Sequence, residues 1–182
     1  MIKVIAFDLV GVLVTEKEIN LNDTEEKLER LFGANISDED YINKAKLITN
    51  ENIIDITKNI INKLYVVKDR DIFRKIKEKY QVKIIIATNH VSYIKDYIIN
   101  NLDIENIDDI IISAKINKIK PNKDFYEYIL DKYNIKNNEL LFIDDNIKNI
   151  NVAASMNINT IKVNKDTDIL EKLKVKMEEL HE

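Results

Sequence analysis

Side chains that could do chemistry stand at four places in this 182-residue sequence. In chain order they are Asp8, the pair Thr88-Asn89, Lys120 and the pair Asp144-Asp145. If the three aspartates met, their negative charges would need a counter-charge. Lys120 and a divalent cation would supply it, and ligands that are all oxygen suit Mg²⁺, which binds through a few carboxylates together with substrate phosphate. The residue types therefore indicate a site for Mg²⁺.

The elements that must position these side chains alternate between strands and helices. Short, β-branched apolar segments predict strands at 2–8, 82–87, 109–113, 139–143 and 158–163, which suit a parallel sheet buried on both faces. Amphipathic patterns predict helices near 69–80, 90–101, 122–134, 146–156 and 166–180. We therefore expect an α/β fold with a three-layer, Rossmann-like parallel-sheet core. Ligands of such sheets bind beyond the carboxyl ends of the strands, where these polar residues fall.

Each polar group also has an ordinary structural explanation. Asp8 could end a strand by accepting hydrogen bonds from loop amides, and either polar pair could cap a helix. A lysine before a proline is by default a solvated surface residue. It is the occurrence of four such groups together, at one edge of one predicted sheet, that favours a shared site over these separate explanations.

Residues 16–66 interrupt the alternation. They show helical patterns at 21–32, 38–49 and 50–64 and no convincing strand, and Ser37 or Asp38 could cap the second helix. We expect a small all-helical cap over the strand ends at 16–66, and a core domain formed by residues 1–15 and 67–182. An irregular crossover that merely packs on the sheet is the alternative.

The composition excludes several classes of protein. A net charge of −4 gives no basic excess for binding nucleic acid. No apolar run approaches the roughly 20 residues that cross a bilayer. The chain has no cysteine, which excludes disulfides and thiolate metal sites and fits a cytoplasmic protein. Nothing in the sequence decides between a monomer and a homodimer.

In their order, the motifs resemble those of the haloacid dehalogenase (HAD) superfamily of hydrolases. That family has a strand ending in Asp-x-Asp-Gly, a strand ending in Ser/Thr-Asn, a Lys-Pro, and a strand ending in Asp-Asp. Here they read FDLVGVLV, IIIATNH, SAKINKIKPNKDFYEYIL and LLFIDDNIKNINVAASMNI. The resemblance covers residues 1–14 and 70–164, and the helical block at 16–66 is similar to the cap of the family.

The resemblance implies a role for each matching residue. Asp8 would be the nucleophile, and Thr88 and Lys120 would stabilise the transferring phosphoryl group. Substrate contacts would come from Thr88, Asn89 and the turn at Gly11, whose neighbouring amides would form an anion nest over 9–12. The implied Mg²⁺ ligands are Asp8, the Val10 carbonyl, Asp145 and, directly or indirectly, Asp144. The substrate would be a small phosphorylated metabolite.

The sequence departs from the family pattern at Val10, where most phosphatases of the family carry a second aspartate as general acid. Three interpretations follow. The protein could be a phosphatase that takes its proton from elsewhere, with Glu16, Glu18 and His90 as candidates. It could be a binding or regulatory module that holds phosphate without turnover. It could be a carbon–halogen hydrolase, although such enzymes need no metal and use a cap arginine, for which Arg30 is the one candidate.

Overall fold

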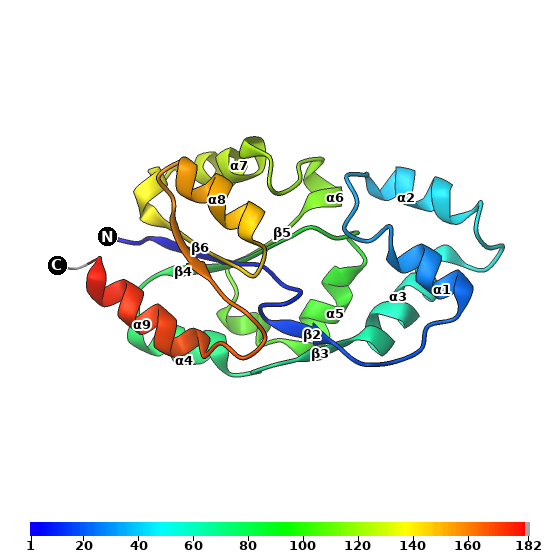
Figure 1. Ribbon diagram of the computed structural model, residues 1–182, viewed down its shortest axis with the longest axis horizontal. Coiled ribbons are helices and arrows are strands. Elements are labelled where there is room, and N and C mark those ends of the chain that lie inside the picture. Colours follow the sequence, from blue (N-terminus) through cyan, green and yellow to red (C-terminus); the bar gives the residue numbers. More distant parts are fainter. Residues whose placement is uncertain (181–182) are drawn as a thin grey trace.

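The core of the protein is a five-stranded parallel sheet, seen in a computed structural model that describes residues 1–180 (Figure 1). The strand order is β5-β4-β1-β6-β7, so β1 lies at the centre. The strands are β1 (Val4–Phe7), β4 (Lys83–Thr88), β5 (Asp109–Ile112), β6 (Leu140–Asp144) and β7 (Asn159–Lys162). All five coincide with predicted segments. Because both faces are covered, the strands are apolar along their length and show little alternation.

Helices cover both faces of the sheet. One core cluster joins the sheet to α4 (Ile72–Lys79), α5 (Ile94–Asn101) and α9 (Ile169–Glu179). The second joins its other face to α7 (Lys123–Tyr133) and α8 (Ile147–Ser155). Short elements complete the core: α6 (Ser113–Ile116) and the 3-10 turns η1 (Ile104–Asn106) and η2 (Asn137–Glu139). The predicted three-layer α/β fold is confirmed.

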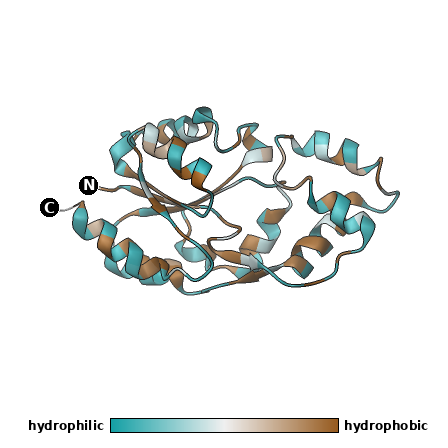
Figure 2. Ribbon diagram, viewed as in Figure 1, coloured by the Kyte–Doolittle hydropathy of each residue, from teal (hydrophilic) through white to brown (hydrophobic). Residues whose placement is uncertain are grey.

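The hydropathy of the ribbon follows these layers (Figure 2). Hydrophobic residues concentrate on the strands and on the inward side of the helices that flank them. Burial of these side chains is the main favourable contribution to folding. Within residues 1–180, none of the helices combines the length and the apolar composition that crossing a membrane requires.

The segment after β1 carries three helices, as predicted, but it also contains strand residues. The helices are α1 (Asp23–Glu29), α2 (Asp38–Ala45) and α3 (Ile53–Leu64). They are framed by β2 (Val14–Glu16) and β3 (Tyr65–Val67), which pair antiparallel as a separate two-stranded sheet. The expectation that 16–66 holds no strand was therefore wrong at both of its ends. Each strand has three residues, too few for a visible alternation, and each forms only because it pairs with the other.

Specific contacts fasten these helices to the core at the carboxyl end of the sheet (Figure 1). Ser37 is the residue that caps α2, since its hydroxyl accepts a hydrogen bond from the Asp40 amide at 3.1 Å. Asp38 instead accepts hydrogen bonds from the backbone amide and the hydroxyl of Ser92, in the loop after β4. A second link joins α3 to α5 through an ion pair of 2.6 Å between Lys58 and Asp96.

Candidate active site

Three neighbouring strands place polar side chains at one point beyond the sheet. Asp8 follows β1 directly, Thr88 ends β4 and Asp144 ends β6, and β1 lies between the other two strands. The Asp8 amide donates a hydrogen bond of 2.9 Å to the Ile143 carbonyl, which continues the β1–β6 pairing to the end of both strands. Parallel pairing in register is therefore what brings these distant residues together.

Lys120 lies between two of the carboxylates. Its Nζ is 2.9 Å from Asp8 Oδ1 and 2.9 Å from Asp144 Oδ2, and the residue is only 3% exposed. Hydrogen bonds between Asn89 and the backbone of Lys120 fix this position: the Asn89 Nδ2 donates to the Lys120 carbonyl at 2.9 Å, and the Lys120 amide donates to Asn89 Oδ1 at 3.0 Å. The Asn89 side chain thus holds the lysine loop, and both of its polar atoms are used there instead of facing a substrate.

Asp144, the last residue of β6, and Asp145, which follows it, lie in different environments. Asp144 is fully buried, and besides Lys120 its carboxylate accepts hydrogen bonds from Asn149 Nδ2 (3.0 Å) and from the Asn146 amide (2.7 Å). Asp145 is exposed. The predicted role of Asp144 as a direct metal ligand therefore conflicts with its hydrogen bonds, which favour a role in holding Lys120.

Position 11 must be a glycine because the side chain of Asp145 lies close to it. The φ of Gly11 is +86°, in the left-handed region that glycine adopts at little cost. A Cβ at this position would lie 2.6 Å from Asp145 Cγ, closer than real Cβ contacts, and 3.1 Å from its Oδ1, which is also unusually close. The amide of Gly11 donates to the Val14 carbonyl at 2.8 Å. Gly11 therefore makes room for the Asp145 carboxylate, and its own amide is used within the loop.

The loop that follows Asp8 offers fewer free amides than predicted. Besides the Gly11 amide, the Leu9 amide is also taken, by Asp8 Oδ1 at 2.7 Å. Among residues 1–180, the Val10 amide has no hydrogen-bond partner, and neither has the hydroxyl of Thr88, a residue that is 1% exposed. An anion nest here would thus use the Val10 amide and the Thr88 hydroxyl, because two of the four amides expected over 9–12, those of Leu9 and Gly11, are already bonded within the loop.

Crowding of the carboxylates shifts their acidity. Burial raises the pKa of Asp8 to about 6; Lys120 opposes this shift and the nearby charge of Asp144 adds to it. Burial and the charge of Asp144 also raise the pKa of Asp145. Burial alone would lower the pKa of Lys120, but its two carboxylate partners outweigh burial and raise it. A single lysine thus serves two buried carboxylates and leaves the cluster short of positive charge.

This shortage matches the requirements of a cation. Asp8, Asp144 and Asp145 each offer an oxygen, and these oxygens lie within 4.8 Å of one another. With Asp144 engaged elsewhere, Asp8 and Asp145 are the carboxylates free to bind. Oxygen ligands of this kind suit Mg²⁺, which keeps several waters and needs few protein ligands. The residues present therefore fit a magnesium ion.

His90, one candidate for the missing acid, lies in a buried aromatic cluster. It is 2% exposed, its ring centroid is 5.0 Å from that of Phe32, and its Nδ1 donates to the Val91 carbonyl at 3.1 Å. Its Nε2 accepts from the Tyr65 hydroxyl at 3.2 Å. Burial lowers the pKa of His90 to about 4. A neutral, enclosed imidazole is not a proton donor for a substrate. Sequence reasoning missed this cluster because its members are far apart along the chain.

Comparison with known protein families agrees with the resemblance found in the sequence. The sequence profile of haloacid dehalogenase-like hydrolases matches residues 68–163, more than half of the chain. The chain belongs to this family. The predicted resemblance to HAD hydrolases is thereby confirmed. No curated protein sequence matches the chain significantly.

Solved structures of HAD proteins share the fold over more than nine-tenths of this chain. A HAD-like family hydrolase from Porphyromonas gingivalis superposes with a TM-score of 0.78 at 20% identity, over 97% of this chain and 98% of its own. A HAD family enzyme from Bacteroides thetaiotaomicron, in complex with magnesium and inorganic phosphate, gives 0.74 at 17% identity, over 94% and 99%. A HAD phosphatase from Thermococcus onnurineus gives 0.62 at 18%, over 92% and 88%. At these identities the likeness establishes the fold.

Proposed function

We propose that this HAD protein is an Mg²⁺-dependent phosphatase that acts on a small phosphorylated metabolite through an aspartyl-phosphate at Asp8. The observation that carries the proposal is the buried Lys120, which contacts both Asp8 and Asp144 beside the exposed carboxylate of Asp145. One carboxylate would be enough to neutralise a buried lysine, so the fold does not require the second carboxylate. The similar B. thetaiotaomicron enzyme, whose structure contains magnesium and phosphate, supports the same chemistry.

The metal would be held by Asp8, Asp145 and the carbonyl of Val10. When bound, Mg²⁺ would supply positive charge that offsets the repulsion between the nucleophile and the phosphate oxygens. Asp144 would act indirectly, because it keeps Lys120 charged and in place. Asn149 takes part in this support, because its Nδ2 donates to the same Asp144 oxygen as Lys120 does.

Asp8 is arranged so that one oxygen is held and the other is available. Oδ1 accepts hydrogen bonds from Lys120 and from the Leu9 amide, while Oδ2 has no partner within residues 1–180. Oδ2 would attack phosphorus, and the bond from phosphorus to the leaving oxygen would break with its electron pair going to that oxygen. The Thr88 hydroxyl and the Val10 amide would donate to the phosphoryl oxygens. Water would then attack the aspartyl-phosphate, releasing phosphate and restoring Asp8.

Val10 restricts the substrates that can react in this way. A valine side chain cannot protonate a leaving oxygen, and a positioned general acid is worth roughly 10² to 10⁴ in rate. His90 is enclosed, as described above, and Glu16 and Glu18 are exposed. We therefore propose that the preferred substrates are those whose leaving group departs without protonation, such as acyl or aryl phosphates.

The dehalogenase alternative receives no support from the cap. Arg30 would have to cradle the halide, but its side chain is 75% exposed and lies 3.6 Å from Glu26 on the surface of α1. The phosphate-binding module remains as the second candidate, and Val10 is the observation that favours it. Turnover distinguishes the two.

The test is phosphate release from acetyl phosphate and 4-nitrophenyl phosphate with Mg²⁺. We expect turnover that is abolished by EDTA and by Asp8→Asn. Asp131→Asn, a change at an exposed aspartate on α7, is the matched control and should retain full activity. Phosphate that stabilises the wild type against heat without any turnover would favour the binding module. Turnover that survives in Asp8→Asn would exclude the proposed nucleophile.

A further inference from the structure

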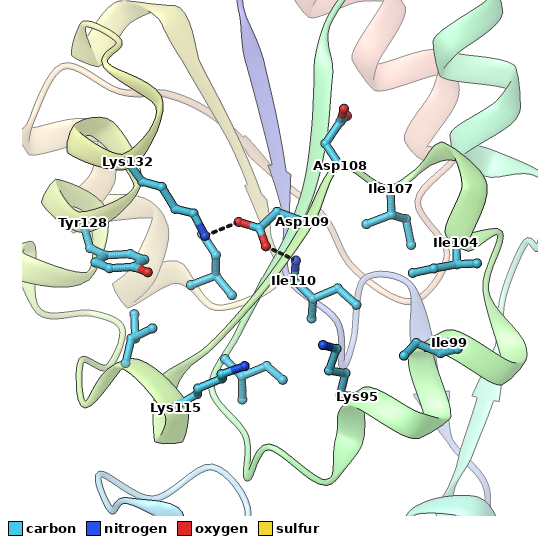
Figure 3. Close-up of a pocket in the computed structure, with 13 residues that line it drawn as sticks. Lys95, Ile99, Ile104, Ile107, Asp108, Asp109, Ile110, Lys115, Tyr128 and Lys132 are labelled. Atoms are coloured by element: carbon cyan, nitrogen blue, oxygen red, sulfur yellow. Dashed lines mark hydrogen bonds and ion pairs between the residues drawn. The ribbon is translucent and has the colours of Figure 1, made fainter.

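The outer edge of the sheet at β5 borders a groove of about 560 Å³ on the surface (Figure 3). β5 is the last strand on its side and pairs only with β4. Outside that ladder, the backbone groups of Asp109–Ile112 make no hydrogen bond to other backbone groups within the described residues 1–180, and only the Ile110 amide has a side-chain partner, Asp109 Oδ1 at 2.8 Å. An edge strand of this kind presents amide and carbonyl groups that a further strand can pair with.

The groove has apolar walls beside this edge. On one side, Ile99 of α5 and Ile104 of η1 are 43% and 38% exposed, and Ile107 lies next to them. Ile116 of α6 and Tyr128 of α7 line the other side. In Figure 3 the isoleucines and Tyr128 stand on opposite sides of the strand. An extended segment lying along β5 would find apolar contacts on both of its faces.

The charges in the groove are unevenly paired. Both of its acidic residues are neutralised: Asp109 by Lys132 at 2.6 Å, and Asp108 by Lys77 at 2.6 Å. The other two lysines of the groove have no ion pair within residues 1–180. They are Lys95, in the first turn of α5, and Lys115, in α6 directly after β5, and both are exposed.

The unpaired lysines lie toward the Ile112 end of β5, because α5 and α6 both begin beyond the carboxyl ends of their strands (Figure 3). The groove therefore has an excess of positive charge at one end, in a chain whose net charge is −4. The missing counter-charge at Lys95 and Lys115 points to a ligand that carries it.

We propose that the β5 edge docks an extended, acidic and apolar peptide segment of another protein as an added strand, with its carboxylates beside Lys95 and Lys115. A second copy of this chain fits less well. Two β5 edges paired about a two-fold axis would bring four unpaired lysines into one interface, and lysines at an edge normally oppose such self-pairing. The groove shares no residue with the candidate active site, so this inference is independent of the proposed phosphatase activity.

The test uses a short, capped, fluorescently labelled peptide of alternating valine and threonine that ends in two glutamates. Its partner probe has two lysines in place of the glutamates. Fluorescence anisotropy at low salt should show saturable binding of the acidic probe and much weaker binding of the basic one. Backbone amide signals of Asp109–Ile112 should shift in NMR spectra on addition of the acidic probe, since strand addition engages those groups.

Two variants examine the two features of the groove. The double substitution Lys95→Glu and Lys115→Glu should weaken binding of the acidic probe roughly tenfold, as expected when two partly exposed charge pairs are reversed. Ile99→Glu should also weaken binding of the acidic probe, because it removes an apolar side chain from the wall of the groove. Lys174→Glu, at an exposed lysine of α9, is the matched control and should leave the affinity unchanged.

Several results would overturn the proposal. These are equal binding of both probes, no binding at millimolar peptide, or binding that leaves the Asp109–Ile112 amides unshifted. Concentration-dependent dimerisation that shifts the same amides would assign the edge to a second copy of the chain, and would also overturn it.

Discussion

The buried histidine makes the stability of the protein depend on pH in a predictable way. His90 is neutral in the folded state because burial lowers its pKa to about 4, although the Val91 carbonyl and the charge of Asp38 partly oppose that shift. In the unfolded chain the same imidazole has a pKa of about 6.5. Between these two values the unfolded state binds a proton that the folded state does not. Stability is therefore complete above about pH 6.5 and decreases as the pH falls toward 4.

The size of the effect follows from the two pKa values. At pH 7.5 the histidine is neutral in both states and contributes almost nothing. At pH 4.5 the difference in proton binding removes about 2–3 kcal/mol from the free energy of unfolding, since each pKa unit corresponds to about 1.36 kcal/mol. That is a substantial part of the 5–15 kcal/mol or so by which proteins are stable.

Urea unfolding at pH 7.5 and pH 4.5 measures this loss in the wild type and in His90→Phe. Groups that titrate in both proteins cancel, so the wild type should lose about 2–3 kcal/mol more than the variant over this range. The variant leaves the Tyr65 hydroxyl without its acceptor, which lowers stability at every pH by roughly 1–3 kcal/mol but adds no slope.

Tyr41→Phe is the matched control, because it removes a buried hydroxyl from the same cluster, hydrogen-bonded to Thr57 at 2.6 Å, without removing a histidine. Its stability should fall while its dependence on pH stays that of the wild type. The reasoning is refuted if wild type and His90→Phe lose the same stability between the two pH values. A ring titration of His90 near 6.5 by NMR would refute it independently.

Three substitutions in the candidate site have equally direct expectations. Lys120→Met leaves two buried carboxylates without their cation and should cost about 3–5 kcal/mol in urea unfolding, with the loss smaller at pH 5 than at pH 8. Gly11→Ala forces a Cβ against Asp145 and should abolish the rise in melting temperature caused by Mg²⁺, while a wild-type rise in this variant would exclude Asp145 as a ligand. Val10→Asp should raise phosphate release from alkyl phosphates by about 10²-fold or more and that from acyl phosphates much less; equal changes would mean that protonation is not limiting.

Much of the fold could be predicted because its elements are locally encoded. The five core strands are short β-branched segments, and the parallel sheet follows from their alternation with helices. The placement of Asp8, Thr88 and the Asp144-Asp145 pair at one edge follows from one further rule, that parallel strands present their carboxyl ends together. Lys120 lies between α6 and α7, so this rule does not place it. Both steps use only local sequence and general topology, and the structure places the residues accordingly.

Features that depend on pairing between distant residues could not be predicted. β2 and β3 exist only through each other, and Tyr65 meets His90 only when the cap has folded back on the core. The different roles of Asp144 and Asp145 could be predicted only in part. Asp144 is the last residue of β6 and Asp145 lies just beyond it, and only the structure shows that Asp144 is the buried one of the two.

The cap is fastened to the loop that carries part of the candidate site. Asp38 is bonded to Ser92, Phe32 packs on His90, and a Cβ on Gly33 would lie 3.6 Å from the Asn89 carbonyl. Asn89 in turn holds the backbone of Lys120. Any displacement of α2 must therefore break a hydrogen bond to the loop after β4, or move that loop together with the cap. The position of α2 and the position of Lys120 are thus linked through a continuous series of contacts.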